Sequence, residues 1–357
     1  MSELRFEDVT VRFGGRRRGM TAVDRVNLTV PSGVVVGLVG ESGSGKSTLA
    51  RAAVGLTAIA GGQILLGGQP VRRAARALGR RPLQMVFQDP YSSLDPRMTV
   101  GESIAEAIPR GPRGAARRAE VGRLLELVDL ADDHTDLYPS HLSGGQRQRV
   151  ALARALAGRP DVIIADEITS ALDVSIQGTV LNLVRDLHRR MSLSMLFISH
   201  NLAVVRYVSD IIAVMYLGQI VEYGPADDVL TDPQHPYTRE LLGAATRPGE
   251  LRLDTSDLGS DLATDDETNG HVHAYDADGT VRADEDGGLR AIADAEPADA
   301  HHPPSGCRFH PRCPIGPLVH LDRDICRTTP PSGDQRKHLA ACHFAAVDAT
   351  TEPQRVA

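Results

Sequence analysis

The sequence predicts an α/β fold of the doubly wound kind, in which helices cover both faces of a parallel sheet. Residues 34–39 form a continuous apolar run bounded by glycine, which is typical of a strand buried on both faces. Later runs of the same character lie at 81–87, 162–165, 194–198 and 211–216. Helical patterns separate the runs, at 114–130, 143–157, 174–190 and 201–208. Buried strands that alternate with helices indicate this fold class.

The N-terminal segment has a different pattern. Apolar and charged residues alternate over residues 3–13, so we expect an edge strand there. A second strand is expected at 26–30, and the first helix at about 46–55, after a glycine-rich loop.

Two regions lack buried strands. Residues 88–158 carry helical patterns only and predict a helical insertion. Residues 248–304 are rich in Asp, Gly, Ala and Pro, which predicts a disordered acidic linker; a short hairpin at 275–292 is the structured alternative. We divide the chain into a first domain, the linker, a small cysteine-rich module and a tail, at 1–247, 248–304, 305–346 and 347–357.

Composition excludes several classes of protein. The 357 residues have a net charge of -7, 4% aromatics and no Trp, so a nucleic-acid partner is not expected. Residues 250–300 hold 15 acidic and 3 basic side chains, and the rest of the chain is net positive. No run reaches the roughly 18 apolar residues of a membrane span. The charged N-terminus lacks the apolar core of an export signal.

A glycine-rich motif joins the strand at 34–39 to the first helix. It fits G-x-x-x-x-G-K-[ST], in which backbone N–H groups and a helix N-terminus bind phosphate. We expect Lys46, one of only two lysines, to reach the β- and γ-phosphates, and Ser47 to bind Mg²⁺. The alternative is a glycine-rich turn without a ligand. The predicted phosphate-binding residues are Gly40, Glu41, Ser42, Gly43, Ser44, Gly45, Lys46, Ser47 and Thr48.

Two carboxylates follow the apolar run at 162–165. At the end of a buried strand, Asp166 is a candidate Mg²⁺ ligand and Glu167 a candidate to polarise an attacking water. His200 closes another buried strand, from which it would contact the γ-phosphate or orient the water. The alternatives are a solvated acidic turn and a structural histidine.

All four cysteines lie within 36 residues, separated by gaps of 5, 12 and 15. The pattern lacks C-x-x-C, which weakens the case for zinc. Four thiolates suit a [4Fe–4S] cluster, and Cys313-Pro314 is similar to a ferredoxin Cys-Pro pair. A core of buried thiols is the third alternative. We expect a ligand, with iron–sulfur ahead of zinc. The candidate ligands are Cys307, Cys313, Cys326 and Cys342.

The segment Leu142-Ser143-Gly144-Gly145-Gln146 precedes a predicted helix. With this motif in place, residues 3–247 strongly resemble the ATP-binding subunit of an ABC transporter. Residues 170–173 resemble its D-loop, Gln88 its Q-loop and His200 its switch histidine. The resemblance implies a P-loop NTPase (RecA-like) core with an antiparallel β subdomain and an inserted α-helical subdomain. It also implies that the protein hydrolyses ATP with Mg²⁺.

The resemblance further implies a dimer, because in ABC proteins the Ser143 motif faces the phosphate loop of the opposite subunit. Physically, Ser143 can cap a helix N-terminus and the glycines let a phosphate approach. Phe13 resembles the aromatic residue that stacks on adenine. The resemblance implies that a partner's nucleotide is contacted by Ser143, Gly144, Gly145, Gln146 and Asp173. It implies that catalysis uses Glu167, His200 and Gln88. It implies that Mg²⁺ is bound by Ser47, Gln88 and Asp166.

Residues 88–100 and 234–242 resemble the ATPases of oligopeptide/dipeptide importers, whose relatives serve nickel chelates, opines and glutathione. The cysteine-containing ending is also typical of that family. Arg97-Met98-Thr99 resembles the second of two non-identical ATPases, which implies a heterodimer. The family implies two transmembrane permease subunits, an indirect link to an extracytoplasmic solute-binding protein, and a peripheral position on the cytoplasmic face of the membrane.

Two other functions remain open at this point. One is a soluble ABC ATPase in DNA repair or translation, although such proteins usually have two ATPase cores, long coiled coils or basic surfaces. The other is a non-catalytic regulatory module, which would require degenerate chemistry. Two positions depart from the importer pattern: Ile168 stands where Pro usually follows the carboxylates, and Asn201 where Asp often follows the histidine.

Overall fold

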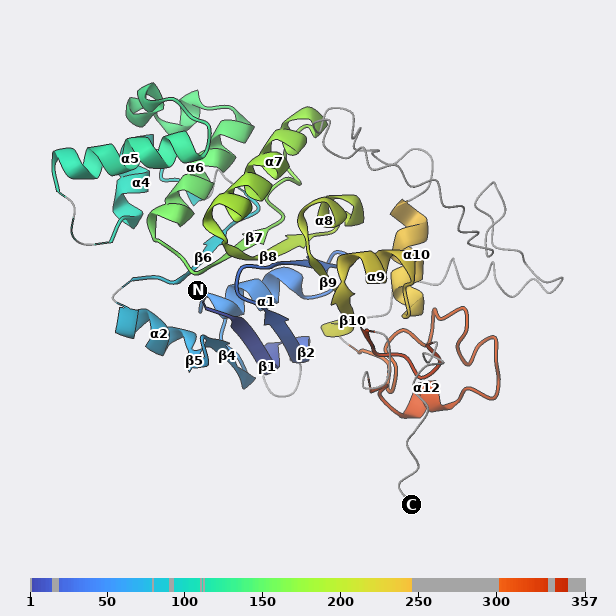
Figure 1. Ribbon diagram of the computed structural model, residues 1–357. Coiled ribbons are helices and arrows are strands. Elements are labelled where there is room, and N and C mark those ends of the chain that lie inside the picture. Colours follow the sequence, from blue (N-terminus) through green and yellow to red (C-terminus); the bar gives the residue numbers. More distant parts are fainter. Residues whose placement is uncertain are drawn as a thin grey trace, which may run out of the picture.

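The computed structural model describes residues 2–14, 19–78, 80–89, 93–109, 111, 113–245, 302–332 and 338–345. Most of the expected acidic linker, the hairpin alternative at 275–292 and the tail lie outside the described residues. The described part contains a larger mixed sheet, a smaller antiparallel sheet, a group of helices above them and a cysteine-containing segment beside them (Figure 1).

The larger sheet has the strand order β11-β10-β9-β3-β8-β7-β6. The strands from β9 to β6 are parallel, whereas β10 and β11 add antiparallel at one edge. This confirms the prediction of an α/β fold with a buried parallel sheet. The bounds are β3 Val35–Val39, β6 Leu83–Val86, β7 Val162–Asp166, β8 Ser194–Ser199, β9 Ile211–Tyr216, β10 Gln219–Pro225 and β11 Leu339–Ala340.

Apolar side chains of β7 and β8 alternate between two apolar cores. One core lies towards the helices, where Ile163 and Phe197 pack with α6 and α7. The other lies towards the smaller sheet and α1, where Ile164 and Leu196 pack. Because every residue of β3, β7 and β8 is buried, these strands lack a polar face, which explains their continuous apolar runs.

The smaller sheet has the order β2-β1-β4-β5, with bounds β1 Leu4–Phe13, β2 Met20–Val30, β4 Gly61–Leu66 and β5 Gln69–Pro70. The prediction of an edge strand at 3–13 was wrong, because β1 pairs with β2 on one side and β4 on the other. Two glycines open β4, so its short apolar run resembles a turn, and the sequence analysis missed it.

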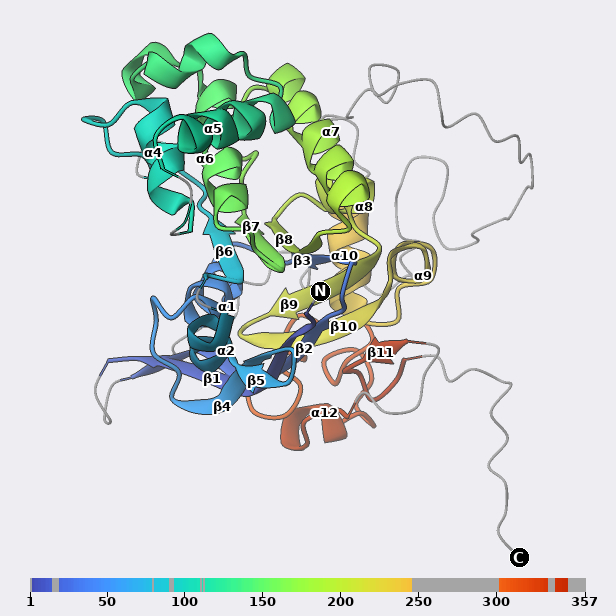
Figure 2. The same cartoon turned by 60° about the vertical axis from the view of Figure 1, so that its left-hand side comes forward.

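The helices form one group above the larger sheet and further segments around it (Figures 1 and 2). Within the described residues, positions 88–158 contain helices and no strand, as expected. The bounds are α1 Lys46–Ala53, α2 Val71–Leu78, α4 Val100–Ala107, α5 Ala115–Leu127, α6 Gly144–Ala157, α7 Val174–Met191, α8 Leu202–Val208, α9 Ala226–Thr231, α10 Pro236–Ala245 and α12 Ile325–Thr328, with 3₁₀ turns at Asp132–Asp136 and Pro139–His141. None of the described helices has both the length and the apolar character needed to cross a bilayer.

The cysteine-containing segment, within 302–345, is attached to the rest of the fold in three ways. β11 pairs with β10, and the buried His338 ring contacts the buried Glu222 carboxylate at 2.6 Å. Glu222 also accepts backbone N–H bonds from Gln234 and His235, at 2.7 and 2.9 Å. In addition, Cys307, Phe309, Cys313 and Cys326 share an apolar core with β9, β10 and α8 to α10. The segment therefore packs as an extension of the larger sheet (Figure 2).

The burial of β7 between β8 and β6 generates a stability prediction. Ile163 is 1% exposed within the core below the helices. Removing one methyl group with Ile163→Val should lower the free energy of unfolding by about 0.5–1.5 kcal/mol, measured by urea denaturation. The matched control is Ile59→Val, since Ile59 is 39% exposed and should change stability by less than about 0.5 kcal/mol. Equal effects at the two positions would contradict the assigned burial.

Candidate functional site

The predicted phosphate loop lies between the end of β3 and the start of α1. Gly45 occupies the N-cap of α1 with φ 107°, a conformation that side chains rarely adopt. A Cβ at this position would lie 2.4 Å from the carbonyl oxygen of Ala22. The loop therefore turns tightly around the N-terminus of α1, where unpaired N–H groups favour an anion.

Lys46 points back into this loop. Its Nζ donates hydrogen bonds to the carbonyl oxygens of Gly40 and Glu41, at 2.7 and 2.8 Å. Burial lowers the pKa of Lys46, an effect opposed by the nearby carboxylates of Glu167, Asp166 and Glu41. A buried ammonium at the centre of a loop of N–H groups is the charge arrangement that a polyphosphate would complement.

Ser47 and Asp166 form the part of the site suited to a metal. The Ser47 hydroxyl donates to Asp166 Oδ1 at 2.9 Å, across the gap between α1 and β7. Burial raises the pKa of Asp166; the Ser47 hydrogen bond lowers it and the charge of Glu167 raises it further. A hydroxyl and a carboxylate, both oxygen donors, fit Mg²⁺, which usually takes one or two protein ligands beside phosphate and water.

Glu167 lies next to both other candidate catalytic side chains. Gln88 Nε2 donates to Glu167 Oε2 at 2.9 Å, and His200 Nδ1 lies 3.4 Å from Oε1. Gln88 also reaches the Ser170 hydroxyl at 3.3 Å. Glu167 has φ 47°, which is unusual for a residue with a side chain and is typical of strained functional positions. The chain thus brings Gln88, Glu167 and His200 together beside the Ser47–Asp166 pair.

The Ser143 motif lies elsewhere. Ser143 caps α6 in a reciprocal capping box with Gln146, whose amide also lies 3.2 Å from His134. Among the described contacts, these polar side chains bond within the motif and to His134, and none reaches the phosphate loop. A Cβ on Gly145 would lie 2.5 Å from Ile176 of α7. The motif therefore packs beside the start of α7, where Asp173 is exposed at the N-cap position.

Two further predicted positions can be placed. Phe13, the last residue of β1, is 44% exposed. Asn201, a departure from the importer pattern, caps α8 by accepting N–H bonds from Ala203 and Val204. Ile168, the other departure, is buried in the core below the helices.

Two residues that hold the phosphate loop were not among the predicted site residues: Tyr237 and Gly218. The Tyr237 hydroxyl accepts a hydrogen bond from the backbone N–H of Glu41 at 2.9 Å. The backbone N–H of Gly218 donates to the carbonyl oxygen of Ser44 at 2.8 Å. Tyr237 lies in the segment 234–242, which resembles the importer ATPases. That resemblance is the only sequence feature that marks Tyr237.

The four cysteines are all buried and form no disulfide. Burial raises the pKa of Cys307 to about 11 and of Cys313 to about 12, and the other thiols of the group raise both pKa values slightly. Burial also raises the pKa of Cys326. Within the described residues, no three His, Cys, Asp or Glu side chains are arranged to hold a single metal ion. The four thiols nevertheless lie close enough to influence one another's charge.

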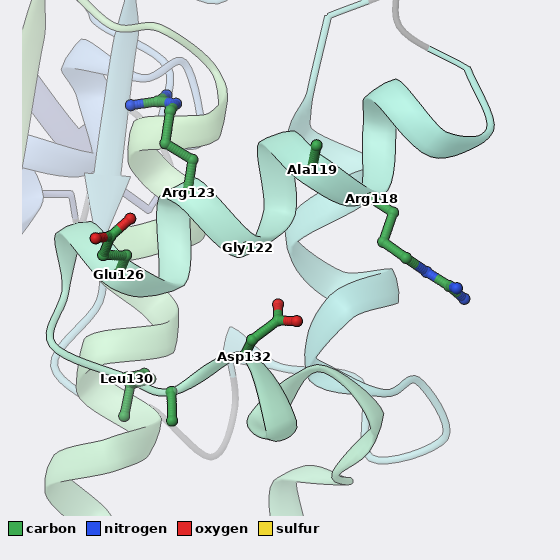
Figure 3. A pocket seen from close by; sticks show the side chains of 8 residues that line it. Arg118, Ala119, Gly122, Arg123, Glu126, Leu130 and Asp132 are labelled. Carbon is green, nitrogen blue, oxygen red and sulfur yellow. The ribbon is translucent and has the colours of Figure 1, made fainter.

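A cavity of about 470 Å³ lies between α5 and the 3₁₀ turn at Asp132–Asp136. Figure 3 shows Asp132 opposite Gly122 of α5, with Arg118 and Arg123 pointing away from it. None of the predicted site residues lines this cavity. A second cavity, of about 440 Å³, is lined by Phe87 beside Gln88, and by Ile108 and Arg154 of the helical insertion.

Comparisons with known proteins agree with this geometry. Residues 23–170 match the ABC transporter family, and residues 221–269 and 280–316 match the oligopeptide/dipeptide transporter C-terminal region. A peptide import ATP-binding protein of Brucella abortus (strain 2308) is 40% identical over 347 residues, covering 94% of this chain and 90% of the relative. A peptide import ATP-binding protein of Brucella ovis is 41% identical over 337 residues, covering 93% of this chain and 92% of the relative.

Solved structures of nucleotide-binding cassettes are also similar. The ATP-binding cassette MJ0796, in a dimeric post-hydrolysis state bound to ADP and phosphate, is 26% identical with a TM-score of 0.54, covering 62% of this chain and 98% of its own. The cbiO1 protein of Clostridium perfringens is part of the ABC transporter complex cbiONQ. It is 26% identical with a TM-score of 0.57, covering 64% of this chain and 90% of its own.

The similarity to the Brucella proteins extends over nearly the whole chain, and the family matches include its C-terminal part. They confirm the resemblance inferred from the motifs, and with it an ATP-hydrolysing cassette that uses ATP and Mg²⁺. The chain belongs to the ATP-binding proteins of ABC transporters, in the branch that carries the oligopeptide/dipeptide transporter C-terminal region.

Proposed function

We propose that this protein hydrolyses ATP to energise the import of oligopeptides, dipeptides or a related small solute through a membrane permease. The observation that carries the proposal is the convergence of Lys46, Ser47, Asp166 and Glu167 at one edge of the parallel sheet. The peptide class rests on the C-terminal region at 221–316 and on the names of the relatives. No comparable observation favours a soluble ATPase of DNA repair or translation.

Each group in the site has a distinct task in this proposal. The loop N–H groups of residues 40–48 and the Lys46 ammonium hold the phosphates. Ser47 and Asp166 hold Mg²⁺, with Gln88 as a further ligand once it leaves Glu167. Bound Mg²⁺ neutralises charge that develops on the phosphate oxygens. The Glu167 carboxylate accepts a proton from the attacking water, and His200 orients that water beside it. Phe13 is assigned to stack on adenine.

The second half of the site comes from another subunit in this proposal. Ser143, Gly144, Gly145 and Gln146 would present the N-terminus of α6 to the nucleotide of a partner, with Asp173 beside it. ATP bound between two subunits then stabilises the dimer, and hydrolysis releases it. We propose a non-identical second ATPase as the partner, because the sequence Arg97-Met98-Thr99 resembles the second of the two ATPases in such importers.

Two permease subunits and, through them, a solute-binding protein outside the membrane complete the proposed assembly, which puts this chain at the cytoplasmic face. The cavity lined by Phe87, Ile108 and Arg154 is the proposed docking groove for a permease segment. It lies between β6 and the helical insertion, and its lining residue Phe87 immediately precedes Gln88. A shift in this groove would move Gln88 relative to Glu167 and so alter hydrolysis.

We also propose that the four cysteines hold a [4Fe–4S] cluster in preference to zinc. A zinc ion draws its four ligands to within about 2.3 Å of one point, whereas a larger cluster holds its sulfurs further apart. The preference for the larger group rests on the cysteine spacing, which lacks C-x-x-C, and on the Cys313-Pro314 pair. The cluster would stabilise a segment too small to fold by apolar burial alone.

Glu167 gives the first functional prediction. In proteoliposomes that contain the permease, the second ATPase, the solute-binding protein and peptide, Glu167→Gln should reduce ATP hydrolysis at least about 100-fold and abolish peptide uptake. ATP binding should persist, because Lys46 and the loop are unchanged, and ATP-loaded dimers should accumulate in size-exclusion chromatography. Glu3→Gln, at an exposed pair with Arg5, is the control and should behave as wild type. Full hydrolysis by Glu167→Gln would refute the assigned role.

Ser143 gives the second functional prediction. Ser143→Ala should leave the ATP affinity of the isolated chain unchanged but lower hydrolysis by the assembled transporter, because Ser143 would contact the partner's nucleotide. Thr99→Ala is the matched control, since Thr99 also closes a capping box, on α4, and each variant should lose about 1 kcal/mol of stability. Hydrolysis that falls equally in both variants would mean that the Ser143 effect is one of stability alone.

The cysteines give the third. The anaerobically purified full chain should absorb visible light and contain about four iron atoms, and Cys313→Ser should lower both values. Because burial raises the thiol pKa values, ligand binding must release protons and should strengthen as the pH rises. Zinc without iron would favour the zinc alternative, and the absence of both metals would leave a core of buried thiols.

A further inference from the structure

The segment 307–313, between the first two cysteines, lies against the phosphate loop. It contributes three side chains that face the first domain: Arg308, Phe309 and Arg312. The loop and this segment are about 270 residues apart in sequence. Their contact therefore arises from the tertiary fold and could not be predicted from any local sequence motif.

The first point of contact is Glu41, the second residue of the phosphate loop. Arg312 Nη1 donates to the Glu41 carboxylate at 3.4 Å, and Arg312 also pairs with Glu240 of α10. The backbone N–H of Glu41 donates to the Tyr237 hydroxyl at 2.9 Å. Both the backbone and the side chain of Glu41 are thus held by residues outside the loop.

These partners of Glu41 have little freedom to move. Tyr237 is fully buried, with its ring centroid 4.6 Å from that of Tyr216 and 5.6 Å from that of Phe309. The Arg312 guanidinium lies 5.9 Å from the Phe309 ring, and its side chain is only 11% exposed. Phe309 therefore packs against both groups that hold Glu41.

The second connection, to Ser44, is indirect. Arg308 donates to the carbonyl oxygen of Leu217 and pairs with Asp24. Leu217 precedes Gly218, whose N–H donates to the carbonyl oxygen of Ser44, and the carbonyl oxygen of Gly218 accepts from the N–H of Asp24. The segment thus supports the loop on both sides of Gly43.

The charge of Glu41 gives this support a consequence for binding. A carboxylate in a loop that receives a triphosphate repels the ligand unless a cation offsets it. Arg312 supplies that cation through a direct ion pair, whereas the Lys46 ammonium acts on Glu41 only through its charge and bonds to the loop carbonyls.

We propose that Arg312 is a positioning residue for nucleotide binding: by fixing and neutralising Glu41, the 307–313 segment sets the affinity of the phosphate loop for ATP. The inference rests on the proposed function, because it assumes that the loop binds ATP. It concerns the arginine contacts and holds whether or not the cysteines carry a ligand.

The test measures binding of a fluorescent ATP analogue with Mg²⁺ to the full chain by anisotropy. Arg312→Gln should raise the Kd about two- to fivefold, because Glu41 is 39% exposed and its ion pair is partly screened. Arg312→Lys, which keeps the charge, should remain closer to wild type. The matched control is Arg323→Gln, since Arg323 lies in the cysteine-containing part of the chain but outside 307–313, stacks on Phe344 and bonds to Ile315 without a recorded contact to the loop.

The decisive variant is the double substitution Glu41→Gln with Arg312→Gln. Glu41 is the one of the two carboxylates paired with Arg312 that lies in the loop, so removing its charge should return the Kd to near the wild-type value, a rescue that general loss of packing would not produce. In the assembled transporter, Arg312→Gln should raise the KM for ATP and leave kcat nearly unchanged. An unaltered Kd in Arg312→Gln, or a double variant as weak as the single one, would overturn the inference. Failure of the wild-type chain to bind the analogue would instead overturn the proposed function.

Discussion

The site depends on one geometric constraint, which is that neighbouring parallel strands end at the same edge of the sheet. β3, β8 and β7 are adjacent and parallel, and each is followed directly by polar residues: the phosphate loop, His200 and Glu167. Residues more than 100 positions apart therefore meet without any long side chain having to span the gap. Ligands in open α/β sheets bind at this edge for the same reason.

That edge is also where burial and charge conflict. Burial lowers the pKa of Lys46 and raises that of Asp166, so in each residue it disfavours the charged form. Both groups are partly satisfied within the chain, Lys46 by loop carbonyls and Asp166 by Ser47. A phosphate and a divalent cation would complement these charges more fully, because each brings the opposite charge into the same poorly solvated space. The chain thus holds the site in a form that is stable alone but favours its ligands.

The parts that the sequence predicts well are those with a short-range signature. β3, β7 and β8 are uniformly apolar, and the phosphate loop combines glycines with Lys46 within nine residues. β10 was not predicted because its sequence contains a charged residue, Glu222, that is buried in the fold. Its carboxylate pairs with His338, which lies more than 100 residues later in the chain. α2 was not predicted because its sequence is rich in arginine and only Ala74 is buried. The bond between Glu41 and Tyr237 spans 196 residues, and no periodicity or motif can reveal such a pair.

The residues of the Ser143 motif also have structural roles within a single chain, independent of any ligand. Gly145 is required by packing, since a side chain there would collide with Ile176, so its presence does not by itself indicate a ligand. Gly144 is less constrained, because a Cβ would lie 3.3 Å from Leu172. The Ser143 hydroxyl accepts the N–H of Gln146 but still has its own hydrogen to donate. The case for a partner's nucleotide at this helix end therefore depends on Ser143 and Gly144, and on the N–H groups that every helix N-terminus leaves unpaired.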